Sequence, residues 1–418
     1  MHRYSLLLSV VAALLFVSCK SSYLAVERAS YQTSDTIFME YIREQNIPVT
    51  KDNRVEILNG ASVKFKRLFD DIRLAKHHIH LEYFNFRNDS INKELLGLLT
   101  EKVKEGVEVR ILFDAFGNSS NDKPLKKESL KEIRATGIEI EPFDPIKFPW
   151  VNHFYHRDHR KIAIIDGNIG YCGGINVADY YLTGLEDVGE WRDMHARVQG
   201  EAAAELQKIF LEMWNKESGE DVGGIDYFPQ PESAEEGSVV AVVDRWPRRN
   251  PAQLRHVYAN AINAAKDSIK IVNPYFVPTK RVSRALKEAL KDSVNVEIMV
   301  SSKSDISFTP DAVMYIAYKF LKRGAKIYLY DGGFNHAKAM SVDGNLLTIG
   351  SANLDARSLC YDYENNLFVF GEESVAEFLQ YYNEDKRKSR LMTRDDWKKI
   401  SPWRKFVGWL GNLITPFL

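Results

Sequence analysis

The sequence contains one constellation of polar residues twice. In each copy a histidine, a lysine, an aspartate and an asparagine follow in the same order and at the same spacing. The copies are His159, Lys161, Asp166 and Asn176, and His336, Lys338, Asp343 and Asn353. Each residue of the second copy lies 177 positions after its counterpart in the first. Because histidine makes up only 10 of the 418 residues, chance is a poor explanation, and the chain is expected to carry two half-sites.

The residues around each histidine predict a β-hairpin. Apolar residues 162–165 and 339–342 follow the two lysines and indicate buried strands. Side chains at positions i and i+2 of a strand share a face, so His159 and Lys161 are expected to point the same way. Each strand runs into an Asp-Gly-Asn turn, which accepts the positive φ of a tight hairpin. The returning strand then brings the asparagine back towards the histidine and the lysine.

This set of groups suits phosphoryl transfer. A phosphodiester is anionic and its transition state spreads charge over the non-bridging oxygens, so positioned donors supply most of the catalysis. Lys161 and Lys338 would supply two point charges, and a unit pair about 4 Å apart is worth roughly 4 kcal/mol at an effective dielectric constant of about 20. Asn176, Ser351 and Asn353 would add neutral donors. One neutral imidazole could attack phosphorus while the opposite imidazolium protonates the leaving alkoxide, so the two histidines should titrate as a coupled pair.

Some of these residues have a structural interpretation as well. Asp166 and Asp343 are candidate catalytic residues, but the turn position favours a role as turn-formers or structural partners. Asn176 and Asn353 could cap a following helix, although their placement favours phosphate binding.

The two motifs resemble the His-x-Lys-x4-Asp signature of the phospholipase D superfamily, and within it the chain most resembles bacterial cardiolipin synthases. The resemblance covers about residues 50 to 418. The tracts that carry it are residues 78–84, 155–161, 191–193, 273–278 and 350–358. The resemblance implies a phosphohistidine intermediate, with His159 as nucleophile and His336 as acid, and no catalytic metal or other cofactor. It further implies that Asp193 and Glu364 orient the histidines, although either could be an ordinary surface or salt-bridged carboxylate.

The resemblance implies transfer of a phosphatidyl group between two phosphatidylglycerols, which gives cardiolipin and glycerol. Hydrolysis of phospholipids to phosphatidic acid is the alternative, because pocket shape and water exclusion select the acceptor. Nuclease action and non-catalytic lipid binding are further alternatives. Lys plus Arg number 56 against 57 Asp plus Glu, so there is no basic field that would favour nucleic acid, and no nucleic-acid partner is expected.

Residues 1–22 are typical of a lipoprotein signal peptide. His2 and Arg3 precede an apolar run, Leu6 to Val17, that is too short to span a bilayer. Cys19 would then become the lipidated N-terminus, although Phe16 departs from the usual leucine and ordinary secretion is the alternative. The chain is therefore expected to be a membrane-attached lipoprotein of a bacterial cell envelope, with its catalytic body outside the cytoplasm. No apolar run of 18 or more residues is present, whereas the cardiolipin synthases it resembles commonly begin with two transmembrane helices.

Three cysteines give no disulfide framework. With Cys19 assigned to lipid, Cys172 is expected to be a small buried hydrophobic residue, and a bridge between Cys172 and Cys360 stays open.

Further repeated segments predict the architecture. Strands and helices alternate in both halves, which indicates an α/β fold built from two repeated phospholipase D-like α/β sandwich halves, packed pseudo-twofold with one site between them. The predicted divisions are an N-terminal half (23–216), a linker (217–237), a C-terminal half (238–390) and an amphipathic tail (391–418). The tail suits an interfacial helix, with packing on the body as the alternative. Aromatic residues 148–150 and 154–155 could receive acyl chains or lie in the core.

Overall fold

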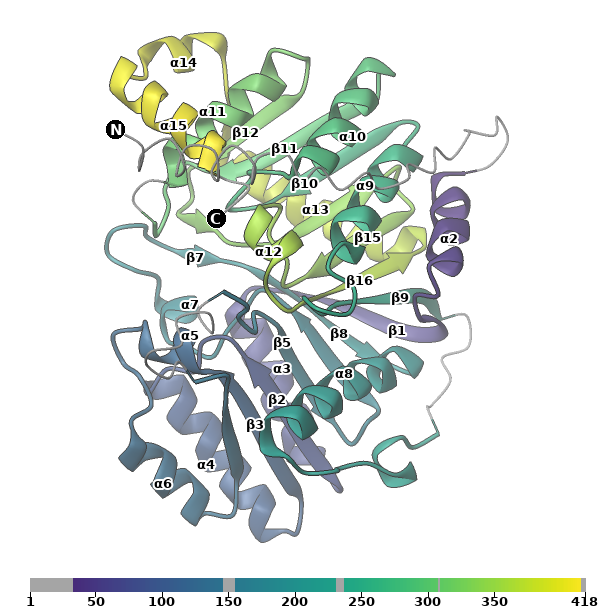
Figure 1. The fold of residues 1–418 in the computed structure, drawn as a ribbon, viewed down its shortest axis with the longest axis vertical. Helices are drawn as coiled ribbons and strands as arrows, with labels where there is room; N and C mark the ends of the chain where they lie inside the picture. Colours follow the sequence, from purple (N-terminus) through teal and green to yellow (C-terminus); the bar gives the residue numbers. More distant parts are fainter. Residues whose placement is uncertain (1–32, 146–154, 231–236, 307–308, 415–418) are drawn as a thin grey trace, which may run out of the picture. The chain divides into compact units, whose positions relative to one another are not determined.

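The computed structural model describes residues 33–145, 155–230, 237–306 and 309–414. Fifteen of its described strands form one sheet, to which both halves contribute (Figure 1). The strands of the N-terminal half are β1 (Val49–Asn59), β2 (His78–Tyr83), β3 (Glu108–Asp114), β4 (Glu139–Phe143), β5 (Lys161–Ile165), β6 (Ile169–Gly173) and β8 (Met194–Gln199). Those of the C-terminal half are β9 (Ser238–Arg245), β10 (Ser268–Val272), β11 (Asn295–Ser301), β12 (Lys326–Tyr330), β14 (Ala339–Val342), β15 (Leu346–Gly350), β16 (Glu364–Phe370) and β17 (Ser389–Leu391).

The strand order shows the internal repeat. From the centre outwards the N-terminal half runs β1-β8-β6-β5-β2-β3-β4, and the C-terminal half runs β9-β16-β15-β14-β10-β11-β12 before the added β17. The halves meet where β1 pairs antiparallel with β9, with Val49 opposite Ala241. The two halves therefore have equivalent topologies, which confirms the predicted fold of two repeated α/β units.

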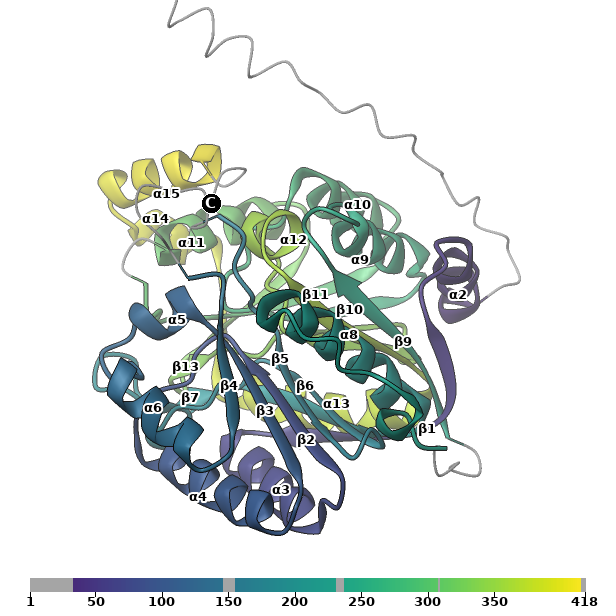
Figure 2. The same ribbon diagram turned by 60° about the horizontal axis from the view of Figure 1, so that its bottom comes forward.

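Helices cover both faces of the sheet and create three cores (Figure 2). The outer helices are α3 (Ala61–Leu74), α4 (Ser90–Lys104) and α6 (Lys127–Ala135) in the first half, and α9 (Gln253–Ala264), α10 (Lys280–Lys291) and α11 (Thr309–Leu321) in the second. The inner helices are α8 (Glu201–Ser218) and α13 (Glu372–Arg387). The inner core combines α8 residues such as Phe210 with α13 residues such as Phe378, so both halves share it.

The two motif hairpins have the predicted turns. Asp166 and Gly167 have φ values of 51° and 66°, and Asp343 and Gly344 have values of 49° and 76°. Two successive positive φ angles are typical of the type I′ turn, which matches the twist of the flanking strands. Both hairpins, β5–β6 and β14–β15, are thus formed by local sequence.

Helix α2 (Ser34–Glu44) departs from the predicted domain boundary. It precedes β1 in the chain, yet Phe38 packs on Phe368 of the C-terminal half and Ser34 Oγ donates to Asn345 Oδ1 at 3.1 Å. The tail begins within β17 and continues as α14 (Arg394–Lys399) and α15 (Pro402–Ile414). Within the described part of the predicted linker, Tyr227 stacks on His80 of β2, so the linker is fixed to the first half.

Two further sequence-level questions have structural answers. Cys172 and Cys360 are both free thiols, so they do not bridge. Across the described ranges we find no helix with the length and hydropathy needed to cross a bilayer.

Candidate active site

The segment that leads into each motif histidine pairs with the opposite half. The backbone N–H of His159 donates to the carbonyl of Tyr363 at 3.0 Å. Reciprocally, the N–H of His336 donates to the carbonyl of Arg192 at 2.6 Å. Beside that second contact, β7 (Trp191–Arg192) and β13 (Phe334–Asn335) form a two-stranded parallel sheet. The two halves are therefore interleaved at the motifs.

Each histidine also receives its carboxylate from the other half. His159 Nδ1 lies 2.8 Å from Glu364 Oε1, at the start of β16. His336 Nδ1 lies 2.7 Å from Asp193 Oδ2, between β7 and β8. An ionised carboxylate can only accept hydrogen bonds, so the proton of each neutral imidazole lies on Nδ1. The lone pair of Nε2 is then available for reaction. Asp193 and Glu364 thus occupy the geometry expected of histidine-orienting residues.

The two motif lysines are buried beside their histidines. Lys161 Nζ donates to the carbonyl of His159, and Lys338 Nζ lies 2.9 Å from His336 Nδ1 and 3.1 Å from His336 Nε2. Burial lowers the pKa of Lys161 to about 7 and also lowers the pKa of Lys338. Both ammonium groups lose hydration on burial, and the nearby carboxylates compensate for that loss only in part. A bound anion would favour their charged form again.

Electrostatic coupling joins the two half-sites into one. Burial lowers the pKa of His159 to about 4, Glu364 opposes that shift, and the charges of Lys161 and Lys338 reinforce it. Burial likewise lowers the pKa of His336, with a further decrease from Lys338. Burial alone would raise the pKa of Glu364, but His159 and Lys161 bring it below its usual value. A lysine of the second motif therefore lies close enough to lower the pKa of the histidine of the first.

The two carboxylates are supported differently. Ser351 Oγ donates to Glu364 Oε2 and so fixes the acid that orients His159. The equivalent position in the first half is Gly174, where a Cβ atom would lie 2.3 Å from Asp193 Oδ1. Glycine is therefore required there for Asp193 to reach His336. Ser351, expected to bind phosphate, is occupied in orienting Glu364.

The two candidate asparagines have different surroundings. Asn176 Oδ1 accepts from the N–H of Asn85 at 3.0 Å and its Nδ2 donates to Tyr181 at 2.9 Å, so this amide is already engaged in structural bonds. Asn353 is buried, and its Oδ1 has no hydrogen-bond partner among the described residues. Of the two amides, Asn353 is the better placed to contact a ligand.

Asp166 and Asp343 do not face the histidines. Asp166 accepts from the backbone N–H groups of Lys76, His77 and His78 at 2.8, 2.8 and 3.0 Å. Asp343 accepts from three equivalent N–H groups, of residues 266–268, at 2.7 to 2.8 Å. Both carboxylates thus fix the helix-to-strand connection that precedes β2 or β10. These contacts favour the structural interpretation of both aspartates over the catalytic one, because their oxygens are already bound at the far end of the strand.

Aromatic rings enclose His336 more completely than His159. The ring centroids of Tyr181, Trp191, Tyr275 and Phe334 lie 6.3, 5.2, 5.9 and 5.6 Å from that of His336. Among described rings, His159 contacts Phe84, at 5.1 Å. The side chain of His159 is 16% exposed and that of His336 is 8% exposed, so the first histidine is the more accessible.

A buried ionic network that the motif pattern does not predict lies beneath the first motif. Arg157 donates to Asp114 at 3.0 Å, and Arg160 pairs with Asp244 and with Glu82, the latter at 3.2 Å. Arg157 and Arg160 flank His159 in the chain and are fully buried, so these pairs position its backbone. Both arginines lie within residues 155–161, a tract that resembles the superfamily. This resemblance is the one sequence feature that could have drawn attention to them.

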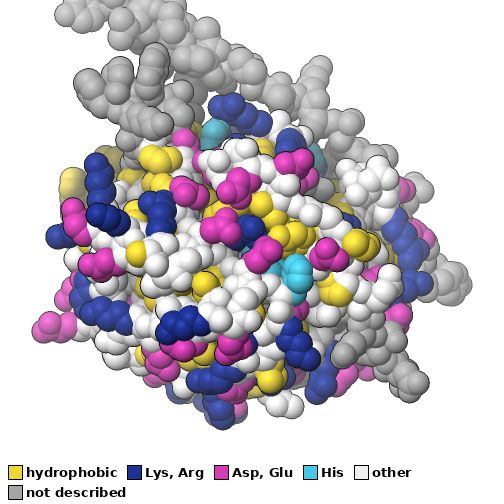
Figure 3. All heavy atoms as spheres, turned by 90° about the horizontal axis from the view of Figure 1, so that it is seen from below, with side chains coloured by type: hydrophobic (Ala, Val, Ile, Leu, Met, Phe, Trp, Pro, Cys, Tyr) yellow, Lys and Arg dark blue, Asp and Glu magenta, His cyan; other side chains and the backbone are white. Residues whose placement is uncertain are grey.

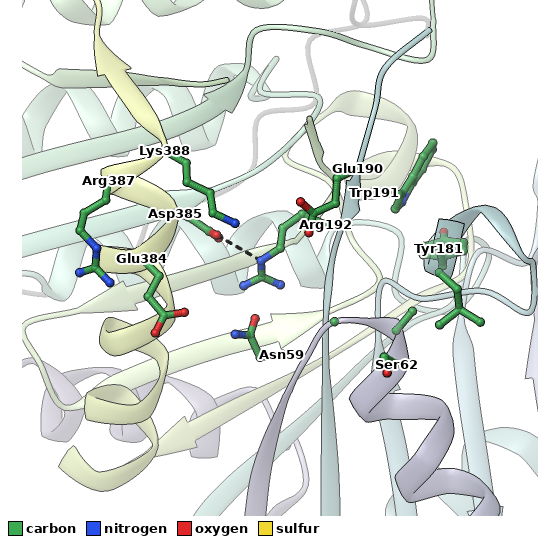
Figure 4. Close-up of a pocket in the computed structure, with 13 residues that line it drawn as sticks. Asn59, Ser62, Tyr181, Glu190, Trp191, Arg192, Glu384, Asp385, Arg387 and Lys388 are labelled. Carbon is green, nitrogen blue, oxygen red and sulfur yellow. Dashed lines mark hydrogen bonds and ion pairs between the residues drawn. The ribbon is translucent and has the colours of Figure 1, made fainter. Parts of the chain in front are cut away.

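A cavity of about 490 Å³ lies beside the second motif (Figure 4). Its walls come from the end of β1, from β7 and from the end of α13, where Arg192 pairs with Asp385 at 3.2 Å. None of the described motif histidines and lysines lines it. The cavity therefore adjoins the catalytic cluster and is distinct from it.

Some predicted residues lie outside the described ranges. These are Cys19 and the aromatic residues 148–150 and 154. Within the described ranges, no three or more His, Cys, Asp or Glu side chains are grouped so as to hold a metal ion. On the face drawn in Figure 3, basic and acidic side chains are interspersed without a continuous field of either sign.

Two similar α/β halves that bring paired His-x-Lys motifs to one site define a phospholipase D-like enzyme. The family model described as "Cardiolipin synthase, PLD-like domain" matches residues 68–214 and 258–386. The chain belongs to this family.

Similar proteins agree with this assignment. A cardiolipin synthase of Listeria monocytogenes serotype 4b (strain CLIP80459) is 36% identical over 389 residues, which cover 92% of this chain and 79% of the relative. The major cardiolipin synthase ClsA of Bacillus subtilis (strain 168) is 35% identical over 395 residues, which cover 94% of this chain and 80% of the relative. A phosphatidylserine synthase structure from Haemophilus influenzae Rd KW20 has a TM-score of 0.72 at 14% identity and covers 91% of this chain and 99% of its own, which shows a common fold.

Proposed function

We propose that this chain is a phosphatidyltransferase that forms cardiolipin from two phosphatidylglycerol molecules. The observation that carries the proposal is the reciprocal pair of histidines, each oriented by a carboxylate of the opposite half. Two imidazoles fixed in this way can serve as nucleophile and as proton donor in one double-displacement reaction. The chain is 35–36% identical in sequence to relatives named as cardiolipin synthases, and this similarity supports a phospholipid substrate.

In the first step, neutral His159 is the nucleophile. Its Nδ1 proton is held by Glu364, so the Nε2 lone pair can attack the phosphorus of the first phosphatidylglycerol. The bond between phosphorus and the glycerol headgroup oxygen breaks. Protonated His336, held by Asp193, donates its Nε2 proton to that oxygen, and glycerol leaves. The product is a phosphatidyl group bound to His159.

In the second step the roles reverse. Neutral His336 accepts the proton of a headgroup hydroxyl of a second phosphatidylglycerol as its oxygen attacks phosphorus. The bond between phosphorus and His159 Nε2 breaks, which releases cardiolipin and restores both histidines. Water in place of the second lipid would give phosphatidic acid instead.

Lys161 and Lys338 stabilise the charge on the phosphoryl oxygens. Burial lowers the pKa of both ammonium groups. An incoming phosphodiester brings a negative charge next to them and raises those pKa values again, so the lysines are fully charged when the transition state forms. A buried pair of this kind favours an anionic ligand.

Product analysis tests this function. Purified protein is given phosphatidylglycerol labelled in the headgroup and in the acyl chains, and cardiolipin, phosphatidic acid and glycerol are followed. Cardiolipin with equimolar glycerol is the expected result, and phosphatidic acid as the sole lipid product would replace transfer by hydrolysis. His159→Ala and His336→Ala should each abolish turnover, whereas the matched control His77→Ala, at an exposed histidine, should retain it.

We further propose that Cys19 carries a lipid anchor and that the chain is attached to a membrane of the bacterial cell envelope. The sequence of residues 1–22 and the lipid substrate support this proposal. Cys19→Ser should remove metabolically incorporated palmitate from the protein, with Cys360→Ser as the control. Equal label in the Cys19→Ser protein would reject the anchor.

A further inference from the structure

Helix α15 exposes an unusual concentration of large apolar side chains. Thirteen large hydrophobic residues are exposed among the described residues, and five of them lie on this helix. They are Trp403 (69% exposed), Phe406 (48%), Trp409 (43%), Leu410 (43%) and Leu413 (49%). At about 100° per residue these five positions fall within an arc of roughly 120° on one side of the helix. We call this arc the aromatic stripe.

The opposite side of α15 is fitted to α11. Gly408 lies so close to α11 that a Cβ atom would be 2.4 Å from the carbonyl oxygen of Asp311, and one on Gly411 would be 3.0 Å from Ala312 Cβ. Arg404 Nε also pairs with Asp311 Oδ1 at 2.7 Å. Figures 1 and 2 both show α15 lying along α11 on the outside of the C-terminal half. The helix is therefore docked by its small residues, and its aromatic stripe points away from the body.

This arrangement is the reverse of ordinary helix packing. A helix that packs for its own stability buries its large apolar residues and exposes its small or polar ones. Here the glycines are in contact and the tryptophans are exposed, so the stripe is available for another partner. An exposed patch of this kind marks an interaction site.

The charges around the stripe indicate the chemistry of that partner. Residues 394–414 contain five basic side chains and two acidic ones, a net charge of +3 in a chain whose overall charge is −1. Arg394, Lys398 and Lys399 of the neighbouring α14 are exposed. Tryptophan and leucine on one face beside lysine and arginine are the composition of a helix that lies in a bilayer interface and attracts anionic lipid.

The docking point of α15 is close in the chain to a residue that supports the surroundings of His336. Asp311 lies in the first turn of α11, and the segment that precedes this helix contains Asp305. Asp305 Oδ1 accepts from Tyr275 at 2.6 Å, and the ring of Tyr275 lies 5.9 Å from that of His336. A surface fixed to this end of α11 would hold the second half-site close to the lipid surface.

We propose that the aromatic stripe of α15 binds the surface of an anionic phospholipid bilayer and presents the active site to its lipid substrate. The stripe enters the interface while α11 holds the helix in a fixed orientation. The inference rests on the proposed function for the link to substrate, and the binding itself is independent of catalysis.

Vesicle sedimentation tests the proposal. The full chain carrying Cys19→Ser, so that no acyl anchor contributes, is mixed with vesicles of phosphatidylglycerol and phosphatidylcholine or of phosphatidylcholine alone. Phe406→Ser/Trp409→Ser should weaken binding to the anionic vesicles at least about 30-fold, because two aromatic side chains lose their burial in the interface. The matched control Ile225→Ser removes a side chain that is 77% exposed elsewhere and should bind as the parent does.

Two further measurements keep the outcomes separate. Brominated acyl chains should quench the tryptophan emission of the parent, and the quenching should fall in Trp403→Phe/Trp409→Phe, which keeps the apolar surface. In detergent micelles, where docking is not needed, the Phe406→Ser/Trp409→Ser variant should retain the turnover of the parent. Absence of parental turnover in micelles would reject the proposed function and leave vesicle binding as an independent result. Unchanged vesicle binding by the Phe406→Ser/Trp409→Ser variant would overturn the proposal. If light scattering shows that the parent is a dimer and this variant a monomer, the stripe would bind a second copy of the chain instead of a bilayer.

Discussion

Replacement of Glu364 by glutamine tests the cross-half orientation of His159 most directly. The carboxylate is buried, lies 2.8 Å from His159 Nδ1 and also accepts from Ser351. Glutamine has nearly the same shape, so the fold should be kept. It removes the charge and brings an amide group that can donate to Nδ1. The neutral imidazole would then favour the tautomer with its proton on Nε2, which has no lone pair for phosphorus.

The size of the effect follows from these two changes. A hydrogen bond to a charged group is worth about 1.5–3 kcal/mol and one between neutral groups about 0.5–1.5 kcal/mol, so the exchange costs roughly 1 kcal/mol. Reversal of the tautomer preference costs about 1–2 kcal/mol more, of the order of one further hydrogen bond. A total of about 2–3 kcal/mol corresponds to a fall in kcat of about 30- to 160-fold, since each tenfold requires 1.36 kcal/mol. Glu377→Gln, on α13 away from the site, should leave kcat unchanged.

The pH dependence assigns the roles of the two histidines. Glu364 raises the pKa of His159 against the larger effect of burial, so Glu364→Gln should lower that pKa further. Because His159 attacks in its neutral form, the acid limb of the kcat/KM profile should move to lower pH. Asp193 raises the pKa of His336 in the same way, so Asp193→Asn should lower it. Because His336 must be protonated, the alkaline limb should then move to lower pH.

The assay is initial-rate formation of labelled cardiolipin in mixed micelles from about pH 3 to pH 9, a range that includes the acid limb set by His159. The reasoning is refuted if Glu364→Gln changes kcat by less than threefold in a protein of parental melting temperature. An exchange of the two limb shifts would instead make His336 the nucleophile.

Three further perturbations concern the support of the site. Gly174→Ala should lower kcat by about tenfold or more, because the new Cβ would lie 2.3 Å from Asp193 Oδ1. The control is Gly97→Ala, where a Cβ meets nothing within 4 Å. Equal kcat values for the Gly174→Ala protein and the parent would contradict the argument. Asp166→Asn should lower the free energy of unfolding in urea by about 1–3 kcal/mol, and kcat per folded molecule should be retained. Loss of kcat in the folded variant would instead indicate a catalytic role for Asp166. Burial lowers the pKa of His78 to about 4 from an ordinary 6.5, so folding stability should be full above pH 6.5 and should fall by about 3 kcal/mol as the pH approaches 4. His78→Asn should flatten that dependence, and an unchanged pH slope would show that other groups cause it.

The sequence by itself determined everything that depends on residues close together in the chain. The Asp-Gly turns require positive φ, the apolar runs after Lys161 and Lys338 require buried strands, and the spacing of 177 requires two equivalent halves. The turns and the strands follow from backbone sterics and side-chain periodicity, which act over a few residues. The family resemblance also implied that Asp193 and Glu364 orient the histidines.

Only the tertiary structure decided which acid serves which histidine. His159 and Glu364 are 205 residues apart and His336 and Asp193 are 143 apart, and each pair joins opposite halves. The same holds for α2, which packs on the half that follows it, and for Asp166, whose carboxylate is bound by backbone N–H groups about 90 residues upstream. No local pattern encodes such contacts, because they exist only when the two halves have packed around their shared core.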